Sequence, residues 1–479
     1  MSAHLDQQFE QYRKLRRENW DSVARGHYPT WGRYYHRRLE EVYRQNIPAG
    51  STVLEVGCGK GNLLAALKPS IGVGIDLSAE MIKAASTHHP QLQFIVGDIH
   101  DAELGNRTFD FIILSDIIND LWDLQFVLNR LQPHCRPETR LVFNFFSQLW
   151  KSPLSLARKI GAANPILLQN WFTEHDVENL LELSGYQPLR AWGEIICPFE
   201  IPMVSDFGNR FLAKIFPFRW FVLTNFLVAR PLPSSRAPAP PPSVSIIVPA
   251  RNEAGHIEQL VTRIPEIGAG TEIVFVEGHS TDDTYAAIKR VAAQYPEGKF
   301  LILQQPGQGK GEAVHAGLDA ARGDILMILD ADITVAPEDL LRFFEALASG
   351  RGEFVNGVRF VYPMHEKAMR FTNLVGNKLF SWAFTWLLGQ KVRDTLCGTK
   401  ALWAKDYRRI AAIRTEFGDF DPFGDFDLLL GAAKLNLKIV EVPLRYGART
   451  YGTTSIRRWR HGLLLLRMVI FASRRIKFR

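Results

Sequence analysis

The chain has 479 residues, more than one hydrophobic core usually serves, so two or three domains are expected. Hydrophobic residues make up 46% and charged residues 22%, values typical of globular proteins. The formal net charge is +7, but residues 1–230 carry equal numbers of basic and acidic side chains, and 457–479 carry eight basic and no acidic ones. The positive charge is therefore a property of the tail, which argues against a nucleic-acid-binding domain face.

The cysteines and the first residues indicate the compartment. Cys58, Cys135, Cys197 and Cys397 are scattered and form no C-x-x-C pair, which argues against a zinc ribbon or a disulfide framework. The first 20 residues are polar and lack the apolar core of a secretory signal. No uncharged apolar run reaches about 18 residues, the usual minimum for a membrane-spanning helix. We therefore expect a cytoplasmic protein.

The segment 456–479 combines basic residues with the apolar run Leu463–Phe471. This pattern suits a peripheral helix on an anionic membrane surface and predicts a location at the inner face of the cytoplasmic membrane. Arg460, Arg467 and Arg474 share one helical face, but apolar residues adjoin them closely. A terminal helix packed on its own domain is therefore the alternative interpretation.

A strand, a glycine turn and a helix open the first half. Thr52–Val56 has a buried-strand pattern, and a second strand ends at Asp76, which predicts a parallel βαβ unit with a right-handed crossover. Small residues in the turn let a ligand approach the backbone closely. A dinucleotide site would need G-x-G-x-x-G, but the third glycine position is Asn62. Asp76, at the tip of the second strand, is placed to accept hydrogen bonds from ribose hydroxyls.

The turn reads E-x-G-x-G-x-G, and with Asp76 and a third strand ending at Asp98 it resembles the class I S-adenosylmethionine-dependent methyltransferases. The resemblance covers about residues 40–230 and includes a late helix, for which Thr173 is the expected N-cap, and a final strand within 223–231. It implies a Rossmann-like sheet, S-adenosyl-L-methionine as cofactor, and Asp98 beside the adenine. The cofactor-binding residues that it implies are Glu55, Gly57, Gly59, Gly61, Asp76 and Asp98.

The methyl acceptor is not identified by these motifs. Methyl transfer depends mainly on positioning and desolvation, and an oxygen or nitrogen acceptor also needs a base. Residues 1–45, rich in Arg, Tyr and Trp, are either an amphipathic lid over the acceptor or a solvated leading helix. The candidate bases, none of them assigned, are His100, Asp116, Asp120 and His175.

The stretch RPLPSSRAPAPPPS (230–243) lies between the halves. Proline removes backbone donors and fixes φ, so this run predicts an extended, semi-rigid spacer. The strand before it ends one sheet and the strand after it begins another. We therefore expect two whole domains, with these boundaries: a helical lid segment at 1–45, a methyltransferase domain at 46–230, a linker at 231–243, a second catalytic domain at 244–455 and a basic apolar helix at 456–479.

The second half restarts with a strand, Val244–Val248, and later places Asp330-Ala331-Asp332 at the end of the buried strand Ile325–Leu329. Two carboxylates one residue apart repel each other. A divalent cation with oxygen ligands relieves this repulsion and can bridge a diphosphate. Taken alone, D-x-D also describes two surface acids at a strand end.

The ordered set VPARNE, VEGHSTDDT, GKGEAVHAGLDAARGD and DAD resembles glycosyltransferase family 2, which implies a GT-A nucleotide-diphospho-sugar transferase fold and a bound Mg²⁺ or Mn²⁺. The resemblance implies that Asp330 faces the ribose and that Asp332, a catalytic residue, ligates the metal; both are metal-site candidates. The nucleotide-sugar-binding residues that it implies are Pro249, Asn252, Glu253, Glu277, Lys310, Asp330 and Asp332.

Later motifs resemble one branch of that family. DTLCGTKALW (394–403), FGDFDLLLGAAKLNLKIVEVPLRY (423–446) and TYGTTSI (450–456) are similar to the polyprenyl-phosphate mannose and glucose synthases. Two positions depart from the pattern. Thr334 stands where some members have a third metal ligand, and Gly278 replaces the second Asp of V-D-D-G-S, so the identity of the nucleotide and the sugar is left open.

The acceptor decides the chemistry of the second half. A hydroxyl acceptor needs a general base, for which Asp425 and Asp427 are the catalytic candidates. A lipid phosphate is already anionic and needs cations, for which Arg359, Arg370 and Arg393 are the candidates. The basic apolar tail favours a polyprenyl phosphate.

The sequence thus predicts an α/β chain with two domains, a bifunctional transferase in which sugar transfer proceeds with inversion. The alternatives are a membrane-associated scaffold with a degenerate methyltransferase domain, and a nucleotidyltransferase second half. The intact acids and glycines argue against decay, and VPARNE replaces the Gly-rich phosphate loop of nucleotidyltransferases.

Overall fold

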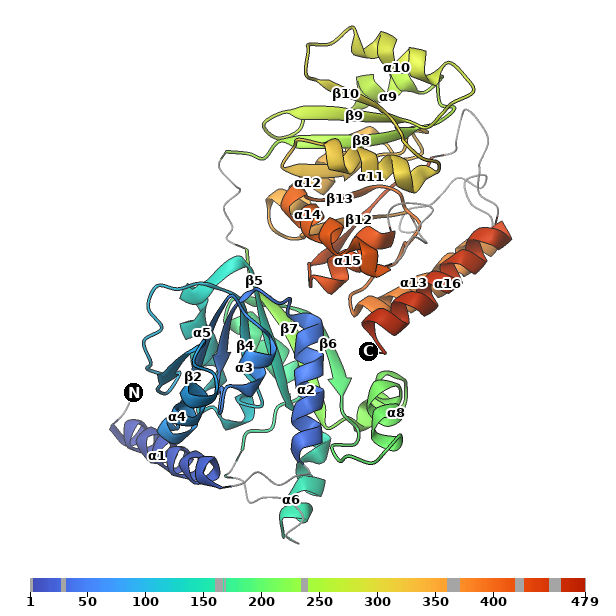
Figure 1. Cartoon of the computed structure of the whole chain (residues 1–479). Helices are drawn as coiled ribbons and strands as arrows, with labels where there is room; N and C mark the ends of the chain where they lie inside the picture. The colour runs from blue at the N-terminus through green and yellow to red at the C-terminus, as the bar shows by residue number, and fades with distance from the viewer. Residues whose placement is uncertain are drawn as a thin grey trace. The chain divides into compact units, whose positions relative to one another are not determined.

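The computed structural model describes residues 3–26, 32–159, 167, 169–233, 240–359, 371–417, 426–447 and 458–478. The described residues up to Leu232 form one compact unit, and those from Pro233 to Lys477 form a second. Each unit is built on its own seven-stranded sheet, shown in Figure 1, which confirms the α/β class with two sheets. Residues 234–239 of the proline-rich spacer lie outside the described residues.

The first sheet has the strand order β3-β2-β1-β4-β5-β7-β6. Strands β1 to β5 run parallel, β7 is antiparallel to β5, and β6 is antiparallel to β7. The elements of this unit are α1 (Ala3–Arg25), α2 (Gly32–Asn46), β1 (Thr52–Val56), α3 (Asn62–Ala66), β2 (Ile71–Asp76), α4 (Ala79–His88), β3 (Gln93–Val96), β4 (Phe109–Ser115), η1 (Ile118–Asp120), α5 (Leu124–Leu131), η2 (Gln132–His134), β5 (Cys135–Phe146), η3 (Gln148–Trp150), α6 (Lys151–Lys159), α7 (Glu174–Leu183), β6 (Tyr186–Glu194), α8 (Val204–Arg210), η4 (Leu212–Lys214), η5 (Phe218–Phe221) and β7 (Thr224–Pro231).

The late part of this unit follows the sequence expectation. Thr173 caps α7 through a capping box with Asp176, in which each side chain accepts a hydrogen bond from the other residue's backbone N–H. The expected final strand is β7, which pairs with β5 and β6.

The carboxyl ends of β1 to β5 meet at one edge of the first sheet. Strand β1 lies between β2 and β4, so the strand order reverses there, and such a switch point is where open α/β sheets bind ligands. Thr224 at the start of β7 pairs with Phe146 at the end of β5 and with Glu194 at the end of β6. The connection between β6 and β7 therefore leaves the sheet at the same edge as the switch point.

The second sheet has the strand order β10-β9-β8-β11-β13-β12-β14. Strands β8 to β11 are parallel, and β13 is antiparallel to both β11 and β12. The elements are β8 (Val244–Ala250), α9 (Ile257–Arg263), β9 (Thr271–Glu277), α10 (Thr284–Ala292), β10 (Phe300–Gln304), α11 (Lys310–Ala320), β11 (Ile325–Ile328), η6 (Pro337–Asp339), α12 (Leu340–Ala348), β12 (Phe354–Val358), α13 (Phe371–Leu388), β13 (Lys400–Trp403), α14 (Ala404–Ala412), η7 (Arg414–Phe417), α15 (Phe426–Lys434), β14 (Ile439–Pro443) and α16 (Arg458–Ile476).

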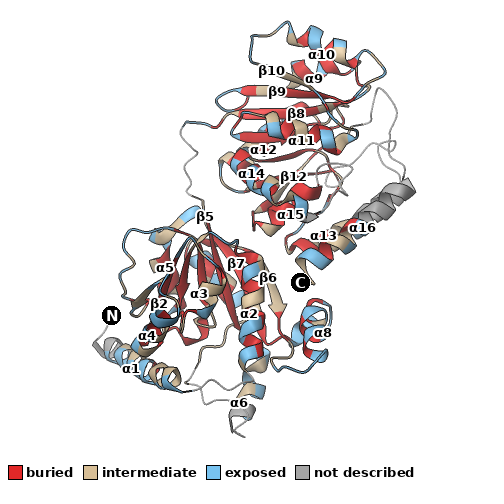
Figure 2. Cartoon of the chain, viewed as in Figure 1, coloured by how far each residue is buried: buried red, intermediate tan, exposed pale blue. Residues whose placement is uncertain are grey.

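Each sheet is buried by helices on both faces, as Figure 2 shows in red. Two apolar clusters flank each sheet, one on either face, as parallel strands require. Within the described ranges, no helix combines the length and the apolar character needed to cross a membrane.

Candidate active sites of the two units

A cavity of about 620 Å³ opens at the switch point of the first sheet. The glycine turn after β1, the ends of β2 and β4, the loop after β3 and the helices α1 and α2 form its wall. Of the expected cofactor residues, Gly61 does not line the cavity; it begins α3 in the left-handed conformation and packs against Phe94. The others lie on the wall: Glu55, Gly57, Gly59, Asp76 and Asp98.

The conformation and packing of the first turn residue, Gly57, require glycine. Gly57 has a φ of 72°, and a Cβ atom there would lie 2.9 Å from the Ile117 side chain, so only glycine fits without strain. Glu55 beside it is 3% exposed, and its Oε2 atom has no hydrogen-bond partner. A buried carboxylate oxygen without a partner is costly, and a cationic or N–H-bearing ligand would satisfy it.

Burial controls the charge of this acid. It raises the pKa of Glu55 to about 8, the nearby carboxylate of Asp76 adds to the rise, and a hydrogen bond from the Leu64 backbone lowers it. Glu55 is therefore largely protonated at neutral pH until a cation approaches. S-adenosylmethionine carries both a sulfonium and an ammonium group, so the residues present fit this cofactor.

Asp76 fixes the glycine turn as well as facing the cavity. Its Oδ2 accepts a hydrogen bond from Gly59 N at 2.8 Å, and its Oδ1 accepts one from Ser78 N at 2.9 Å. Burial raises the pKa of Asp76, and these two amides oppose the rise. A carboxylate offers about four lone-pair positions, so two remain for ribose hydroxyls. Ribose binding by Asp76 stays a prediction.

Asp98 is held by His100 and by a residue from the first helix. Its Oδ1 lies 2.6 Å from His100 Nδ1, and its Oδ2 lies 3.4 Å from Arg13 Nε. Burial alone would raise the pKa of Asp98, but these partners lower it below its usual value. Asp98 is thus a fixed anion on the cavity wall, and its contact with adenine stays a prediction.

Helix α1 packs over the cavity. The Arg16 Nε and the Tyr12 hydroxyl donate to the backbone oxygen of Asp120 at 3.0 and 2.9 Å, and Arg16 is 6% exposed. Phe9 makes an edge contact with His100, with 5.3 Å between ring centroids. Asp21 accepts a hydrogen bond from the Ser78 hydroxyl. This packing fits a lid better than a solvated leading helix.

The end of β4 places an acid deeper in the same cavity. Asp116, with a φ of 55°, accepts hydrogen bonds at Oδ1 from the Tyr35 hydroxyl at 2.8 Å and from the Asn144 amide. Burial raises the pKa of Asp116 to about 6, so it is ionised at neutral pH. His36 lines the cavity as well, and burial lowers its pKa, so the imidazole is neutral there.

The other candidate bases for methyl transfer differ in whether they line the cavity. His100 and Asp120 line the cavity, whereas His175, in the first turn of α7, is not among its lining residues. No base is assigned among them.

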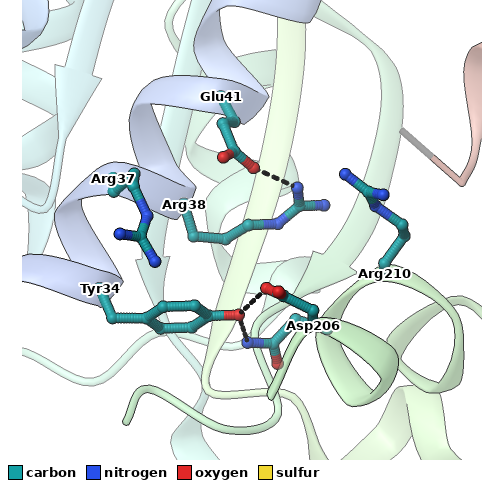
Figure 3. Close-up of a pocket in the computed structure, with 7 residues that line it drawn as sticks. Tyr34, Arg37, Arg38, Glu41, Asp206 and Arg210 are labelled. Atoms are coloured by element: carbon teal, nitrogen blue, oxygen red, sulfur yellow. Dashed lines mark hydrogen bonds and ion pairs between the residues drawn. The ribbon is translucent and has the colours of Figure 1, made fainter. Parts of the chain in front are cut away.

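A smaller cavity of about 200 Å³ lies on the outer side of α2, against α8 (Figure 3). The Tyr34 hydroxyl donates to Asp206 at 3.0 Å and accepts a hydrogen bond from the Asn209 amide at 3.1 Å. Arg38 Nη1 donates to Glu41 at 2.7 Å. Arg37 lines both cavities, so α2 separates the cofactor cavity from the connection between β6 and β7.

The D-x-D acids lie at the end of β11 in the second unit. Asp330 Oδ1 is 2.5 Å from the ammonium of Lys310, the first residue of α11. Asp332 Oδ1 accepts a hydrogen bond from the Thr334 hydroxyl at 2.7 Å. Burial and then the charge of Asp330 raise the pKa of Asp332. Thr334, which replaces a third ligand, thus orients Asp332.

Asp330 and Asp332 fit the expected metal only if other ligands complete its coordination. Asp332 is a half-buried acid whose charge is disfavoured, which is what a divalent cation offsets. No group of three or more His, Cys, Asp or Glu side chains within the described ranges is arranged to hold a metal. Asp330 and Asp332 would therefore hold the cation together with water and substrate phosphate oxygens, a ligand set usual for Mg²⁺.

The expected nucleotide side is a hydrogen-bonded corner between the ends of β8 and β9. The Asn252 side-chain oxygen accepts from Thr281 N at 2.8 Å, and Glu277 Oε1 accepts from Ser280 N at 2.6 Å. Burial would raise the pKa of Glu277, but these hydrogen bonds lower it. Glu253 is 5% exposed and contacts His256 Nδ1 at 2.9 Å, while Pro249 is half-buried in β8. Nucleotide binding by these residues stays a prediction.

The candidate bases differ in what is known of them. Asp425 lies outside the described residues. Asp427, in the first turn of α15, has its Oδ2 within 3.0 Å of His315 Nε2 and 3.2 Å of Arg414 Nε. Its carboxylate is therefore already contacted by two neighbours that sequence reasoning did not find. A catalytic role for either acid stays a prediction.

The three arginines predicted to contact the acceptor phosphate differ in their surroundings. Arg359 is buried and forms a two-point ion pair with Asp394, at 2.7 and 2.9 Å. This pair weighs against a phosphate role for Arg359. Arg393 is half-exposed, with its Nε 3.8 Å from Glu441. Arg370 lies outside the described residues. All three roles stay predictions.

The structure adds residues near the first cavity that the motifs did not indicate. Arg13, Arg16 and His36 line this cavity, and Tyr35 hydrogen-bonds its wall residue Asp116, because α1 and α2 fold back over the sheet edge. The only sequence signal was the density of Arg and aromatic residues in 1–45. In the second unit, a Cβ atom at Gly398 would lie 2.5 Å from Asp330 Oδ2, so the segment DTLCGTKALW (394–403) packs directly on D-x-D.

Comparison with known proteins agrees with both halves. The model of a "Methyltransferase domain" matches residues 26–191, and that of "Glycosyl transferase family 2" matches residues 245–409. The fold of the magnesium protoporphyrin IX methyltransferase of Synechocystis PCC 6803 is similar at 17% identity and a TM-score of 0.34, over 46% of this chain and 99% of that one.

Two curated relatives are glycosyltransferases. Glycosyltransferase AglJ of Haloferax volcanii is 28% identical over 214 residues, which are 44% of this chain and 66% of that protein. The dolichol-phosphate mannosyltransferase of Pyrococcus furiosus is 26% identical over 231 residues, 45% of this chain and 59% of that protein. The chain thus spans less than two thirds of the length of these relatives. Together with the two sheets, the matches show that this chain joins a methyltransferase domain to a glycosyltransferase family 2 domain.

Proposed function

We propose that the chain is a bifunctional transferase, which methylates one acceptor with S-adenosylmethionine and transfers a sugar from a nucleotide-diphospho-sugar to a polyprenyl phosphate. The observation that carries the proposal is that each unit has its own set of acids at the carboxyl edge of its own sheet. These are Glu55 and Asp76 in the first unit and Asp330 and Asp332 in the second.

In the first unit, S-adenosylmethionine when bound supplies an activated methyl group on its sulfonium. Glu55 and Asp76 hold the cofactor, and the aromatic side chains of α1 exclude water from it. Asp116 is ionised at neutral pH and lies on the same wall, so it can accept a proton from the methyl acceptor. Tyr35 and Asn144 orient its carboxylate.

In the second unit, Asp332 and Asp330 hold Mg²⁺ or Mn²⁺, which neutralises the departing diphosphate when bound. Lys310 adds a positive charge next to Asp330. A lipid phosphate is favoured as the acceptor over a hydroxyl because Asp427, the described candidate base, is buried between His315 and Arg414. The name of the Pyrococcus furiosus relative, a dolichol-phosphate mannosyltransferase, supports the same acceptor class. A phosphate oxygen would attack the anomeric carbon of the sugar as the nucleoside diphosphate leaves from the opposite side. This direct displacement would invert the configuration at that carbon.

The tail is proposed as a peripheral membrane contact at the inner face of the cytoplasmic membrane. Helices α13 and α16 pack side by side (Figure 1), and both carry exposed apolar side chains. Trp382 on α13 is 81% exposed, and Leu466 and Ile470 on α16 are about half-exposed. Basic residues of α16 suit anionic lipid headgroups.

The test uses the full chain with isotope-labelled S-adenosylmethionine, labelled nucleotide-sugars and a polyprenyl phosphate, with products identified by mass spectrometry. We expect a lipid-linked sugar that forms only with Mg²⁺ or Mn²⁺, and Asp332→Asn to lower its yield at least about 100-fold. The exposed acid Asp283 supplies the matched control Asp283→Asn, which should leave the yield unchanged. Full sugar transfer by Asp332→Asn would refute the metal role, and methyl transfer should be unaffected by either change.

A further inference from the structure

The connection between β6 and β7, residues 195–223, exposes large apolar side chains. This segment, which we call the insertion, contains α8, η4 and η5. Met203 is 85% exposed, Phe216 66% and Trp220 58%, and Figure 2 shows α8 largely in the colour of exposed residues. Others of the same kind are Phe199, Ile201, Val204, Phe207, Ile215, Phe218 and Phe221. The ring centroids of Phe216 and Trp220 lie 5.0 Å apart, and exposed apolar side chains gathered in one segment favour an interaction site in soluble proteins.

Two neutral polar side chains of the insertion, Asn209 and Ser205, point inward. Asn209 is 1% exposed; its oxygen accepts from Ile196 N and Cys197 N, and its amide donates to the Tyr34 hydroxyl. Ser205 is buried as well and donates to the backbone oxygen of Phe199 at 2.5 Å. The insertion is therefore held by buried hydrogen bonds while many of its large apolar side chains are exposed, which is unusual for a water-facing loop.

A second element extends this surface. Trp150 of η3 donates through its indole N–H to the backbone oxygen of Phe221 at 3.1 Å, which fixes η3 against the insertion. Leu149 of η3 and Leu156 of α6 are 65% and 61% exposed. Residues 147–159 thus add apolar side chains next to the end of the insertion.

The charges around the surface are mostly positive. Among the described side chains of segments 147–159 and 195–223, the exposed charged ones are three basic residues, Lys151, Arg210 and Arg219, and two acidic residues, Glu200 and Asp206. Lys214 is paired with Glu194, and Arg210 is exposed at the end of α8. Apolar and aromatic side chains bordered by basic residues are the chemistry that anionic bilayers attract.

This surface is connected to the cofactor cavity. The insertion leaves the first sheet at its carboxyl edge, where the cavity opens. Helix α2 joins the two: its Tyr34 hydrogen-bonds Asp206 and Asn209 of the insertion, and its Tyr35 hydrogen-bonds Asp116 of the cavity. An acceptor held at the surface of the insertion would therefore lie next to the methyl-transfer site.

We propose that the insertion and residues 147–159 form a docking surface for an anionic lipid bilayer, and that the methyl acceptor is carried by a membrane lipid. The second clause rests on the proposed methyltransferase activity, whereas the first does not. Side chains from α8, η5, η3 and α6 enter the interfacial layer, with the aromatic rings at headgroup depth. Docking brings the mouth of the cofactor cavity to the lipid surface.

The test measures co-sedimentation of the full chain with phosphatidylcholine vesicles containing about one third phosphatidylglycerol. The variant Phe216→Ser/Trp220→Ser removes two of the most exposed side chains. We expect it to lower the partition coefficient at least about tenfold. The matched control Leu183→Ser/Leu341→Ser changes two similarly exposed apolar residues outside the surface and should bind as the wild type does. Unchanged binding of S-adenosylhomocysteine by calorimetry shows that the variant is folded.

The tail is tested separately with Leu466→Ser/Ile470→Ser, so loss of tail binding and loss of insertion binding are distinguished. Wild-type partition of Phe216→Ser/Trp220→Ser would overturn the proposal. So would light scattering that shows a wild-type dimer converted to a monomer by the same change, because a second copy would then cover the surface. Docking confirmed together with absent methyl transfer would instead refute the proposed function of the first unit alone.

Discussion

Glu55 shows how a single buried acid couples cofactor binding to pH. Its pKa of about 8 means that the folded chain holds a proton that the unfolded chain, with an ordinary value near 4.5, has already released. The native state therefore binds more protons across this window, and stability falls as the pH rises from about 4.5 to 8. A ligand cation beside Oε2 reverses this preference by stabilising the ionised form.

The change Glu55→Gln removes this titration. Relative to the variant, we expect the free energy of unfolding of the wild-type first unit to fall by up to about 1.4 kcal/mol per pH unit within that window. Chemical unfolding followed at several pH values checks this, and the transition that S-adenosylhomocysteine shifts identifies the first unit. Exposed Glu103→Gln is the control, and parallel pH dependences for wild type and Glu55→Gln would contradict the expectation.

At this scale the sequence identified acids and glycines but not their partners. Glu55, Asp76, Asp330 and Asp332 were found because strand ends and short spacings identify them. That Arg359 pairs with Asp394 depends on two segments 35 residues apart meeting in space, which no local pattern encodes. The contacts of His315 and Arg414 with Asp427 were not predicted for the same reason.

Helix α1 is the element whose removal tests the lid. Arg16 faces the cavity and Arg17 beside it faces solvent, so the two form a matched pair. We expect Arg16→Ala to detach α1 from Asp120 and to weaken binding of S-adenosylhomocysteine about tenfold, because a buried charged hydrogen bond is lost. Arg17→Ala should bind as the wild type does.

Calorimetry measures both affinities, and hydrogen exchange shows whether the α1 amides open faster in Arg16→Ala. Equal affinities for the two variants would show that α1 does not close the cofactor site. A lower affinity with unchanged exchange would place the effect on the cavity wall and not on the lid.

The sequence predicted elements where burial dictated a pattern. Apolar runs such as Thr52–Val56 and Val244–Val248 correspond to β1 and β8, because central parallel strands are buried on both faces. The insertion did not follow the rule, since many of its large apolar side chains are exposed while Ser205 and Asn209 are buried. The sequence alone does not distinguish an apolar residue that packs in the protein core from one that faces outward.

At the scale of the molecule, the two units have separate sheets and separate cores. We expect residues 1–232 and 240–479, expressed apart, each to fold and to keep its own activity, because each compact unit contains its whole donor site. Methyl and sugar transfer by the separate units, compared with the full chain, check this. Loss of either activity on separation would show that the boundary at Leu232 cuts a functional unit.

The architecture was predictable because two complete motif sets flank a proline-rich run. The domain boundaries given from sequence stay predictions, since residues 234–239 and 448–457 lie outside the described ranges.

Gly398 limits which residue can stand next to the Lys310–Asp330 ion pair of the second unit. Its missing side chain leaves the space in which Lys310 and Asp330 meet, and a methyl group there would lie within 2.6 Å of both. Both contacts are ends of side chains, so alanine would displace the ion pair before it displaced the sheet. We therefore expect related sequences that form the Lys310–Asp330 contact to have glycine at this position.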